Sequence, residues 1–246
     1  MRALTQRDGW ASVGPFFVTF HPTSNMTFMN YAIPAQPEVD VSDLPRTVDR
    51  LRGLFRERKR VLRFEFLEPI HKGLGAALKE CGLKLEREAP LMVCGRGDLV
   101  DFVNHDVQVR TLDAQVSDEV LKELLLVGRR AFGVGDDVVK PAEIAEQRGH
   151  LGAGRYRTAY ATIDGVVVGI GSMTVQTDEL VGIGTLPEHR RRGVGASVSS
   201  FLVREHFLRG GKMAWLSAGD ETAEAVYRKI GFHTVGVQSN YVDAIE

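Results

Sequence analysis

The stretch Glu179–Ala196, ELVGIGTLPEHRRRGVGA, decides how the rest of the chain is interpreted. Its first part is apolar and favours a β-strand, which Pro187 ends because proline lacks the N–H that continued pairing needs. A run of three arginines and a Gly-Val-Gly sequence follow. Apolar residues then recur at helical spacing up to Gly210. The pattern therefore predicts a strand, a basic glycine turn and a helix.

The start of such a helix is suited to bind an anion. Its first N–H groups have no partner inside the helix, and the helix dipole places partial positive charge there. Glycines allow close approach of the backbone, and arginines add fork-shaped donors, so a diphosphate is a suitable ligand. A Rossmann dinucleotide site is disfavoured, because the spacing is R-x-x-G-x-G in the C-terminal half. A P-loop is excluded, because its motif is missing from the sequence.

A second motif, DETAEAVYRKIGF, follows at Asp220–Phe232. Together the two motifs resemble those of the GNAT acetyltransferase superfamily. The first is similar to the acyl-CoA signature (Q/R)-x-x-G-x-G/A after a strand. The second is similar to N-x-x-A-x-x-x-Y-x-x-x-G-F, with Asp220 where asparagine is usual. The resemblance covers about residues 105–246, and two ordered motifs are more specific than either alone.

This resemblance implies direct transfer of an acetyl group from acetyl-CoA to a primary amine, without an acyl-enzyme. Tyr227 is then the candidate general acid, because a phenol with a pKa of ~10 is protonated at neutral pH. Glu179, at the strand start, is the candidate base, and an exposed structural carboxylate is the alternative. The implied CoA-binding residues lie on the strand, the turn, the helix start and the second motif: Ile183, Gly184, Thr185, Arg190, Arg191, Arg192, Gly193, Val194, Gly195, Ala196 and Asp220.

Composition indicates an ordinary globular protein. With 43% hydrophobic and 26% charged residues and a net charge of -1, the chain lacks the basic excess of a nucleic-acid or membrane-surface protein. Two cysteines are too few for a disulfide scaffold. No signal peptide or membrane span is visible, so we expect a cytoplasmic protein. The histidines show no metal spacing, so no metal is expected, and His189 and His206 are predicted to lie at the surface.

From Val107 onwards the order of expected elements is that of a GNAT domain. We predict a strand over 107–112, helices from 117 and over 141–150, and a hairpin at Asp164-Gly165. The motif strand and helix follow, then a strand over 213–217 and a final antiparallel pair over 232–237 and 239–242. The expected fold is α/β, with a mixed, mostly antiparallel sheet and a splayed parallel strand pair.

The N-terminal part predicts strands over 16–20 and 26–33, a helix from 42, a strand over 61–67 and a short helix before Gly82. Its order resembles that of the second half, so we expect a degenerate GNAT-like domain over 1–104 and a catalytic domain over 105–246. Because this part lacks R-x-x-G-x-G, it should not bind CoA in the usual way. It would complete a sheet, enclose the substrate or mediate a homodimer.

Three functional hypotheses remain open at this stage. The first is an acyl-CoA-dependent N-acetyltransferase acting on a small-molecule amine or on a peptide or protein amine. The second is a non-catalytic acyl-CoA-binding or partner-binding module on the same fold. The third, a phosphate or nucleic-acid binder, is disfavoured by the net charge and by the lack of aromatic residues among the arginines.

Overall fold

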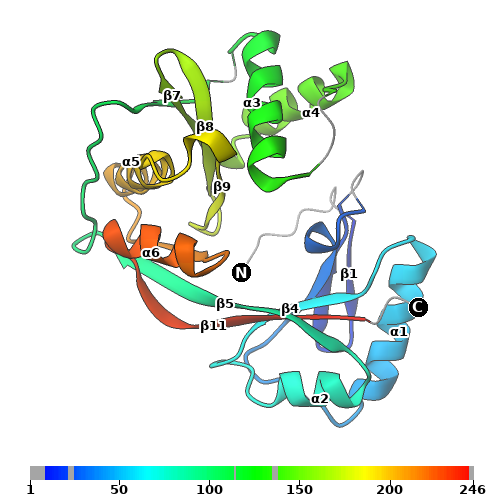
Figure 1. The fold of residues 1–246 in the computed structure, drawn as a ribbon. Coiled ribbons are helices and arrows are strands. Elements are labelled where there is room, and N and C mark those ends of the chain that lie inside the picture. The colour runs from blue at the N-terminus through cyan, green and yellow to red at the C-terminus, as the bar shows by residue number, and fades with distance from the viewer. Residues whose placement is uncertain (1–8, 22–24, 114, 135–137, 244–246) are drawn as a thin grey trace. The chain divides into compact units, whose positions relative to one another are not determined.

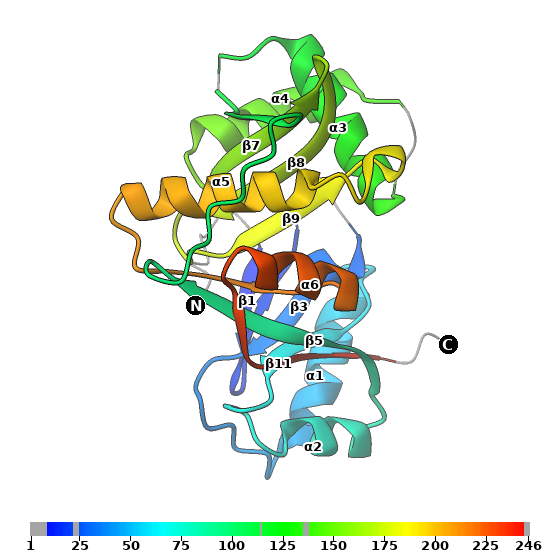
Figure 2. The ribbon, with the colours of Figure 1, turned by 60° about the vertical axis from the view of Figure 1, so that its left-hand side comes forward.

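The computed structural model describes residues 9–21, 25–113, 115–134 and 138–243 (Figures 1 and 2). The chain forms two compact units. The C-terminal unit comprises Met92–Thr234, and the N-terminal unit comprises the preceding chain with the last strand, from Val235 onwards. These units do not coincide with the predicted domains over 1–104 and 105–246, because the last strand pairs inside the N-terminal unit.

The N-terminal unit is a sheet with two helices. Its sheet has the order β1-β2-β3-β4-β11-β5, in which β3 and β4 are parallel and the β1–β2, β2–β3 and β4–β11 pairs are antiparallel. The elements are β1 (Trp10–Val13), β2 (Phe16–Thr19), η1 (Thr27–Met29), β3 (Tyr31–Pro34), α1 (Leu44–Glu57), β4 (Arg63–Leu67), α2 (Leu74–Glu80), β5 (Lys84–Gly95) and β11 (His233–Val242).

Apolar spacing explains the helices of this unit, because α1 buries Leu44, Val48, Leu51 and Phe55 against the core, as predicted. The strand predicted over 26–33 is wrong in its first half. Thr27–Met29 is a 3-10 turn, and the Asn30 side chain donates to the Met26 carbonyl at 2.8 Å, so β3 begins only at Tyr31.

The C-terminal unit contains a four-stranded antiparallel sheet of order β6-β7-β8-β9, and β10 pairs with β5. The predicted hairpin turn is confirmed, with positive φ at both Asp164 and Gly165. The elements are β6 (Gln108–Thr111), α3 (Asp118–Phe132), α4 (Pro141–Gly152), β7 (Tyr156–Ile163), β8 (Val166–Thr174), β9 (Leu180–Thr185), η2 (Pro187–His189), α5 (Val194–Leu208), β10 (Met213–Ser217) and α6 (Glu221–Lys229).

Helices cover both faces of the four-stranded sheet (Figures 1 and 2). On one face α5 packs with Val168 and Met173 into one core, and on the other α3 packs with Val167 and Leu186 into a second. Adjacent β8 residues thus serve opposite cores, as the alternation of a strand requires. The predicted α/β fold with a mixed, mostly antiparallel sheet is confirmed.

The two halves of the chain repeat one order of elements. β3-α1-β4-α2-β5 in the first half corresponds to β9-α5-β10-α6-β11 in the second, which supports the predicted tandem arrangement. The final pair of strands predicted over 232–242 is instead the single strand β11, which pairs with β4 through Gln238–Val242. No helix within the described part of the chain is both long and apolar enough to cross a membrane.

Candidate active site

The parallel strands β9 and β10 meet at one point and then separate. A single bridge joins Glu179 to Trp215, whose backbone N–H donates to the Asp178 carbonyl at 3.1 Å. Beyond this bridge β9 is the terminal strand of the four-stranded sheet, and β10 pairs with β5. The described residues therefore contain the predicted splayed pair, and β9 is an edge strand of its sheet after Glu179.

A bulge places β9 close to helices on both of its faces. The β8–β9 register shifts between Ile170 and Ser172, where Gly182 has φ +62°. Two glycines make room for the neighbours: a Cβ at Gly171 would lie 2.3 Å from Ile183 Cδ1, and one at Gly184 would lie 2.8 Å from Ala131 Cβ. The bulge therefore fixes the segment Ile183–Thr185 between α5 and α3.

The turn after β9 brings the chain into α5 through two left-handed residues, Arg191 at φ +65° and Gly193 at φ +77°. Asn104 holds this turn, because its Nδ2 donates to the Arg192 carbonyl at 2.8 Å. A Cβ at Gly193 would lie only 2.9 Å from that nitrogen. Glycine is therefore needed here for both conformation and space. Nothing in the sequence distinguished Asn104, because its partner lies 88 residues later.

The N-terminus of α5 has the properties of an anion site. Gly193 is its N-cap, no side chain among the described residues caps the helix, and its first turn contains no acidic residue. Val194 and Ala196 are buried, so they offer their backbone rather than their side chains. A Cβ at Gly195 would lie 3.7 Å from Ile183 Cγ2 and 3.8 Å from Thr185 Oγ1. The residues predicted on β9 and on α5 are thus brought together.

The three arginines of the turn have different environments. Arg190 donates to the Ala131 carbonyl at the end of α3, at 2.9 Å, and so ties the turn to that helix. Arg192 is exposed and lies 3.2 Å from His189 Nδ1. Arg191 is exposed, and its guanidinium has no partner among the described residues. Arg191 is therefore the arginine most available to a phosphate.

Tyr227 lies on α6 with its ring 5.9 Å from that of Phe232. Burial, and to a smaller extent the charge of Asp220, raises the pKa of Tyr227 to about 12. Tyr227 and Ile183 pack against the same core cluster, which contains Val194. Asp220 is the N-cap of α6 and accepts from Ala223 N at 2.7 Å, so its carboxylate also has a structural role.

Glu179 is 6% exposed, so the alternative of an exposed strand-end carboxylate does not apply. Its backbone is held on both sides. Thr174 Oγ1 accepts from Glu179 N at 2.8 Å, Thr174 N donates to Glu179 O at 2.8 Å, and Trp215 is the bridge partner. Glu179 therefore lies at the point where β9 and β10 separate.

The surface position predicted for His206 is wrong. This residue is 4% exposed, and its Nε2 lies 3.1 Å from the Met213 carbonyl. Its place in α5 explains the burial, because the helix end packs on β10, which sequence spacing alone did not reveal. Among the described residues, no group of three or more His, Cys, Asp or Glu could hold a metal ion.

Residues 129–232 match the family model "Acetyltransferase (GNAT) family", and this segment contains β9, the arginine turn, α5 and Tyr227. This segment of the chain matches a GNAT acetyltransferase domain. No curated protein matches the chain. The GNAT family and its fold support acyl transfer in general.

Solved structures resemble the chain over nearly its full length. A GCN5-related N-acetyltransferase from Kribbella flavida has a TM-score of 0.77 and 24% identity, covering 97% of this chain and 90% of the other. One from Sphaerobacter thermophilus has a TM-score of 0.68 and 12% identity, covering 94% and 80%. A tandem GNAT protein from the clavulanic acid biosynthesis pathway has a TM-score of 0.64 and 15% identity, covering 92% and 77%. These likenesses concern the fold.

The N-terminal unit differs from the GNAT domain at the corresponding helix start. Its α1 begins with Asp43 as N-cap and Pro45 in the first turn, where α5 has glycine and arginines. A carboxylate at this position disfavours a phosphate.

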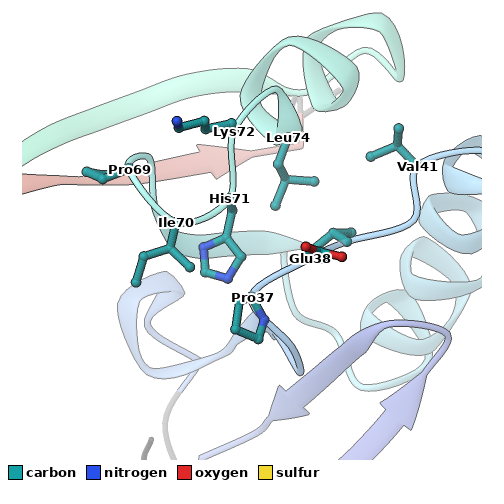
Figure 3. A pocket seen from close by; sticks show the side chains of 9 residues that line it. Pro37, Glu38, Val41, Pro69, Ile70, His71, Lys72 and Leu74 are labelled. Carbon is teal, nitrogen blue, oxygen red and sulfur yellow. The ribbon is translucent and has the colours of Figure 1, made fainter.

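The N-terminal unit also contains a pocket of about 460 Å³. It is lined by residues that follow β3 and β4 in the chain, among them Glu38, His71 and Leu74 (Figure 3). The described residues that line this pocket include no arginine.

Proposed function

We propose that the GNAT domain is an acyl-CoA-dependent N-acetyltransferase that transfers an acetyl group from acetyl-CoA to a primary amine. One observation carries this proposal: the opening between β9 and β10 begins at Glu179, and the strand that borders it ends beside the uncapped N-terminus of α5. An extended ligand with an anionic end would be bound by both features. The glycines and the missing cap fit the diphosphate and pantetheine arm of CoA.

The backbone provides most of the binding groups in this proposal. N–H groups of Ile183, Gly184 and Thr185 would bind the pantetheine arm and the carbonyl oxygen of the thioester, where negative charge develops during the reaction. N–H groups from Arg191 to Ala196 would bind the diphosphate, helped by the Arg191 guanidinium. Arg192 would serve an outer phosphate, whereas Arg190 is engaged with Ala131 and would act by holding the turn.

The proposed reaction is a direct attack. The amine nitrogen forms a bond with the thioester carbon, and the bond from that carbon to sulfur breaks. Glu179 accepts the proton that the amine loses, directly or through a water molecule, and Tyr227 donates to the departing sulfur. With a pKa of about 12, the phenol keeps its proton at neutral pH. At this pKa the phenol of Tyr227 is a weaker acid than a thiol. It therefore first donates a hydrogen bond to the thiolate as the thiolate forms.

The alternative is a module that binds acyl-CoA or a protein partner without catalysis. A binder does not need a protonated phenol on α6, and the presence of Tyr227, which packs against the same core cluster as Ile183, favours the enzyme. The acceptor remains a class, namely a primary amine on a small molecule, a peptide or a protein.

The test is a release assay with purified full-length protein and acetyl-CoA. Free thiol should appear when a panel of primary amines is supplied and not when the amines are omitted. Binding of acetyl-CoA without thiol release on any amine would favour the non-catalytic alternative. Failure to bind acetyl-CoA would overturn both.

A further inference from the structure

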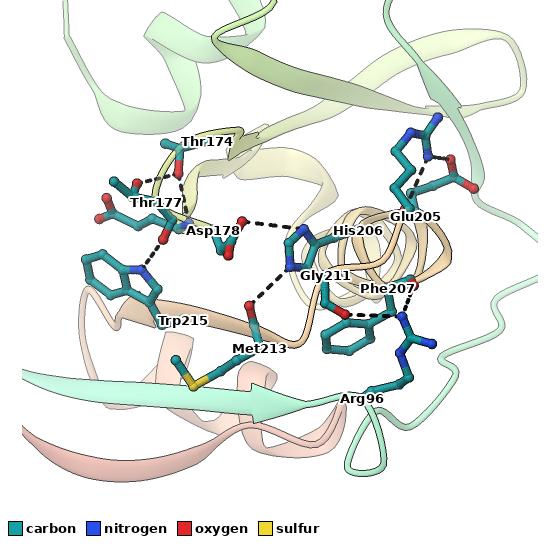
Figure 4. Close-up of polar contacts among 12 residues, drawn as sticks. Arg96, Thr174, Thr177, Asp178, Glu205, His206, Phe207, Gly211, Met213 and Trp215 are labelled. Atoms are coloured by element: carbon teal, nitrogen blue, oxygen red, sulfur yellow. Dashed lines mark hydrogen bonds and ion pairs between the residues drawn. The ribbon is translucent and has the colours of Figure 1, made fainter. Parts of the chain in front are cut away.

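A set of contacts ties the segment Thr177–Glu179, just before β9, to β10 and α5 (Figure 4). We call it the β9–β10 clip and define it by Thr177, Asp178, His206 and Trp215. None of these residues has a role in the reaction proposed above. All of them lie in the C-terminal unit, next to the candidate base.

Trp215 contributes two hydrogen bonds to the clip. Its backbone N–H donates to the Asp178 carbonyl at 3.1 Å, and its indole Nε1–H donates to the Thr177 carbonyl at 2.6 Å. Two successive carbonyls before Glu179 are therefore held by one residue of β10. Phenylalanine at this position would keep an aromatic ring but would lose the indole donor to Thr177 O.

His206 contributes the contact from α5. A carbonyl oxygen can only accept, so Nε2 carries a proton and donates to Met213 O at 3.1 Å. The other ring nitrogen, Nδ1, lies 3.8 Å from Asp178 Oδ1. The imidazole is confined, because a Cβ at Gly211 would lie 2.0 Å from its Nε2. His206 thus links β10 and the residue before Glu179 to one rigid helix.

The other side of the segment is held by β8. Thr174 Oγ1 lies 2.7 Å from Thr177 Oγ1 and accepts from Glu179 N at 2.8 Å. Asp178 adopts φ +57°, which costs a non-glycine residue energy and persists only where neighbours enforce it. The segment is therefore clamped between β8 and β10, and pairing of β9 with β10 stops at Glu179.

We propose that Trp215 and His206 are positioning residues that fix the point where β9 separates from β10, and with it the place of the Glu179 carboxylate. The proposal rests on the proposed function, since it assigns these residues to the alignment of that base. The segment Ile183–Thr185 is held independently by β8 and by the start of α5. Loosening the clip should therefore displace the base more than the CoA-binding backbone.

The experiment compares Trp215→Phe and His206→Gln with the wild type in the full chain. Trp215→Phe removes only the indole donor, and glutamine at 206 can still donate to Met213 O. Matched controls are Trp10→Phe and His233→Gln, which change the same residue types at exposed positions. The readouts are kcat, KM for the amine, the Kd for acetyl-CoA, the pH–rate profile, and amide hydrogen exchange over 177–183.

Trp215→Phe should lower kcat by about tenfold, a loss typical of slight misplacement, and leave the Kd for acetyl-CoA within about twofold. The acidic limb of its pH–rate profile should shift, and exchange over 177–183 should accelerate while the melting temperature stays near that of the wild type. The kcat of His206→Gln should fall less than that of His206→Leu, because leucine cannot donate a hydrogen bond to Met213 O.

Two negative outcomes are distinguishable. If the wild type turns over but folded Trp215→Phe and His206→Leu keep its kcat and acidic limb, the positioning role is refuted and the proposed function stands. If the wild type itself neither binds acetyl-CoA nor releases thiol, the proposed function fails and the positioning role fails with it.

Discussion

Gly195 of α5 faces Thr185 of β9, and a Cβ at Gly195 would stand 3.8 Å from Thr185 Oγ1, an ordinary contact. Packing therefore does not require glycine at this position, and its φ is not positive. In the proposed function the ligand passes between the strand end and the helix start, and a residue without a side chain at 195 leaves room for it.

Gly195→Ala should therefore separate folding from binding. Alanine in a helix is more stable than glycine by about 0.5–1 kcal/mol, so the melting temperature should stay the same or rise. The added methyl narrows the approach to the helix N–H groups, and the Kd for acetyl-CoA should increase at least about tenfold, or about 1.4 kcal/mol. Calorimetry and thermal melts measure the two effects. An unchanged Kd for acetyl-CoA in the alanine variant would show that the space beside Gly195 is not part of the binding site.

Arg191 and Arg190 should behave differently on substitution. Arg191→Ala should weaken acetyl-CoA binding and reduce its dependence on ionic strength, because an exposed guanidinium acts on phosphate through a screened interaction. The melting temperature of Arg191→Ala should equal that of the wild type. Arg190→Ala should lower the melting temperature, because it loses the bond to Ala131 O. Calorimetry at low and high salt tests this, and equal losses of affinity and stability in both variants would contradict the assignment.

Tyr227→Phe should lower kcat by about a hundredfold, the usual size of a general-acid contribution, with little change in the Kd for acetyl-CoA. Because the pKa of Tyr227 is about 12, deprotonation of this phenol should cause no loss of activity below pH 10. Steady-state kinetics from pH 6 to pH 10 and calorimetry supply the data. Parallel losses of kcat and affinity would argue for a packing role instead.

The same raised pKa makes a prediction about stability. The folded state holds the Tyr227 proton more tightly than the unfolded chain, where the pKa is near 10.0. The stabilisation is fully present below pH 10 and is lost as pH rises through 12. Chemical denaturation of the wild type should therefore show a steeper fall in unfolding free energy over this window than Tyr227→Phe. Identical slopes would mean that the phenol is not buried.

The sequence predicted those features of the site that are local in the chain. The run from Arg190 to Gly195 specifies a turn and a helix start within a few residues, and Tyr227 follows from a motif on a single helix. Asn104, Trp215 and His206 could not be predicted, because each acts on a partner that only the folded chain brings near. The same reason explains β11, whose pairing with β4 joins residues far apart in sequence.

β10 of the second half pairs with β5 of the first half, and β11 pairs with β4. We therefore predict that the second half does not fold on its own. A fragment of residues 105–246 lacks β5, the partner of β10, and its β11 lacks β4. We expect this fragment to unfold without cooperativity, whereas the full chain unfolds cooperatively. Circular dichroism during thermal unfolding tests this, and a fragment that melts sharply and binds acetyl-CoA like the full chain would support the domain boundary predicted at 104 and 105.

The most direct test of the central claim is calorimetric titration of the folded full-length protein with acetyl-CoA. The uncapped α5 start and the diverging strands predict saturable binding at one site per chain, weakened by Gly195→Ala and by Arg191→Ala. Absence of any binding heat at several temperatures, with a fold verified by circular dichroism, would contradict it.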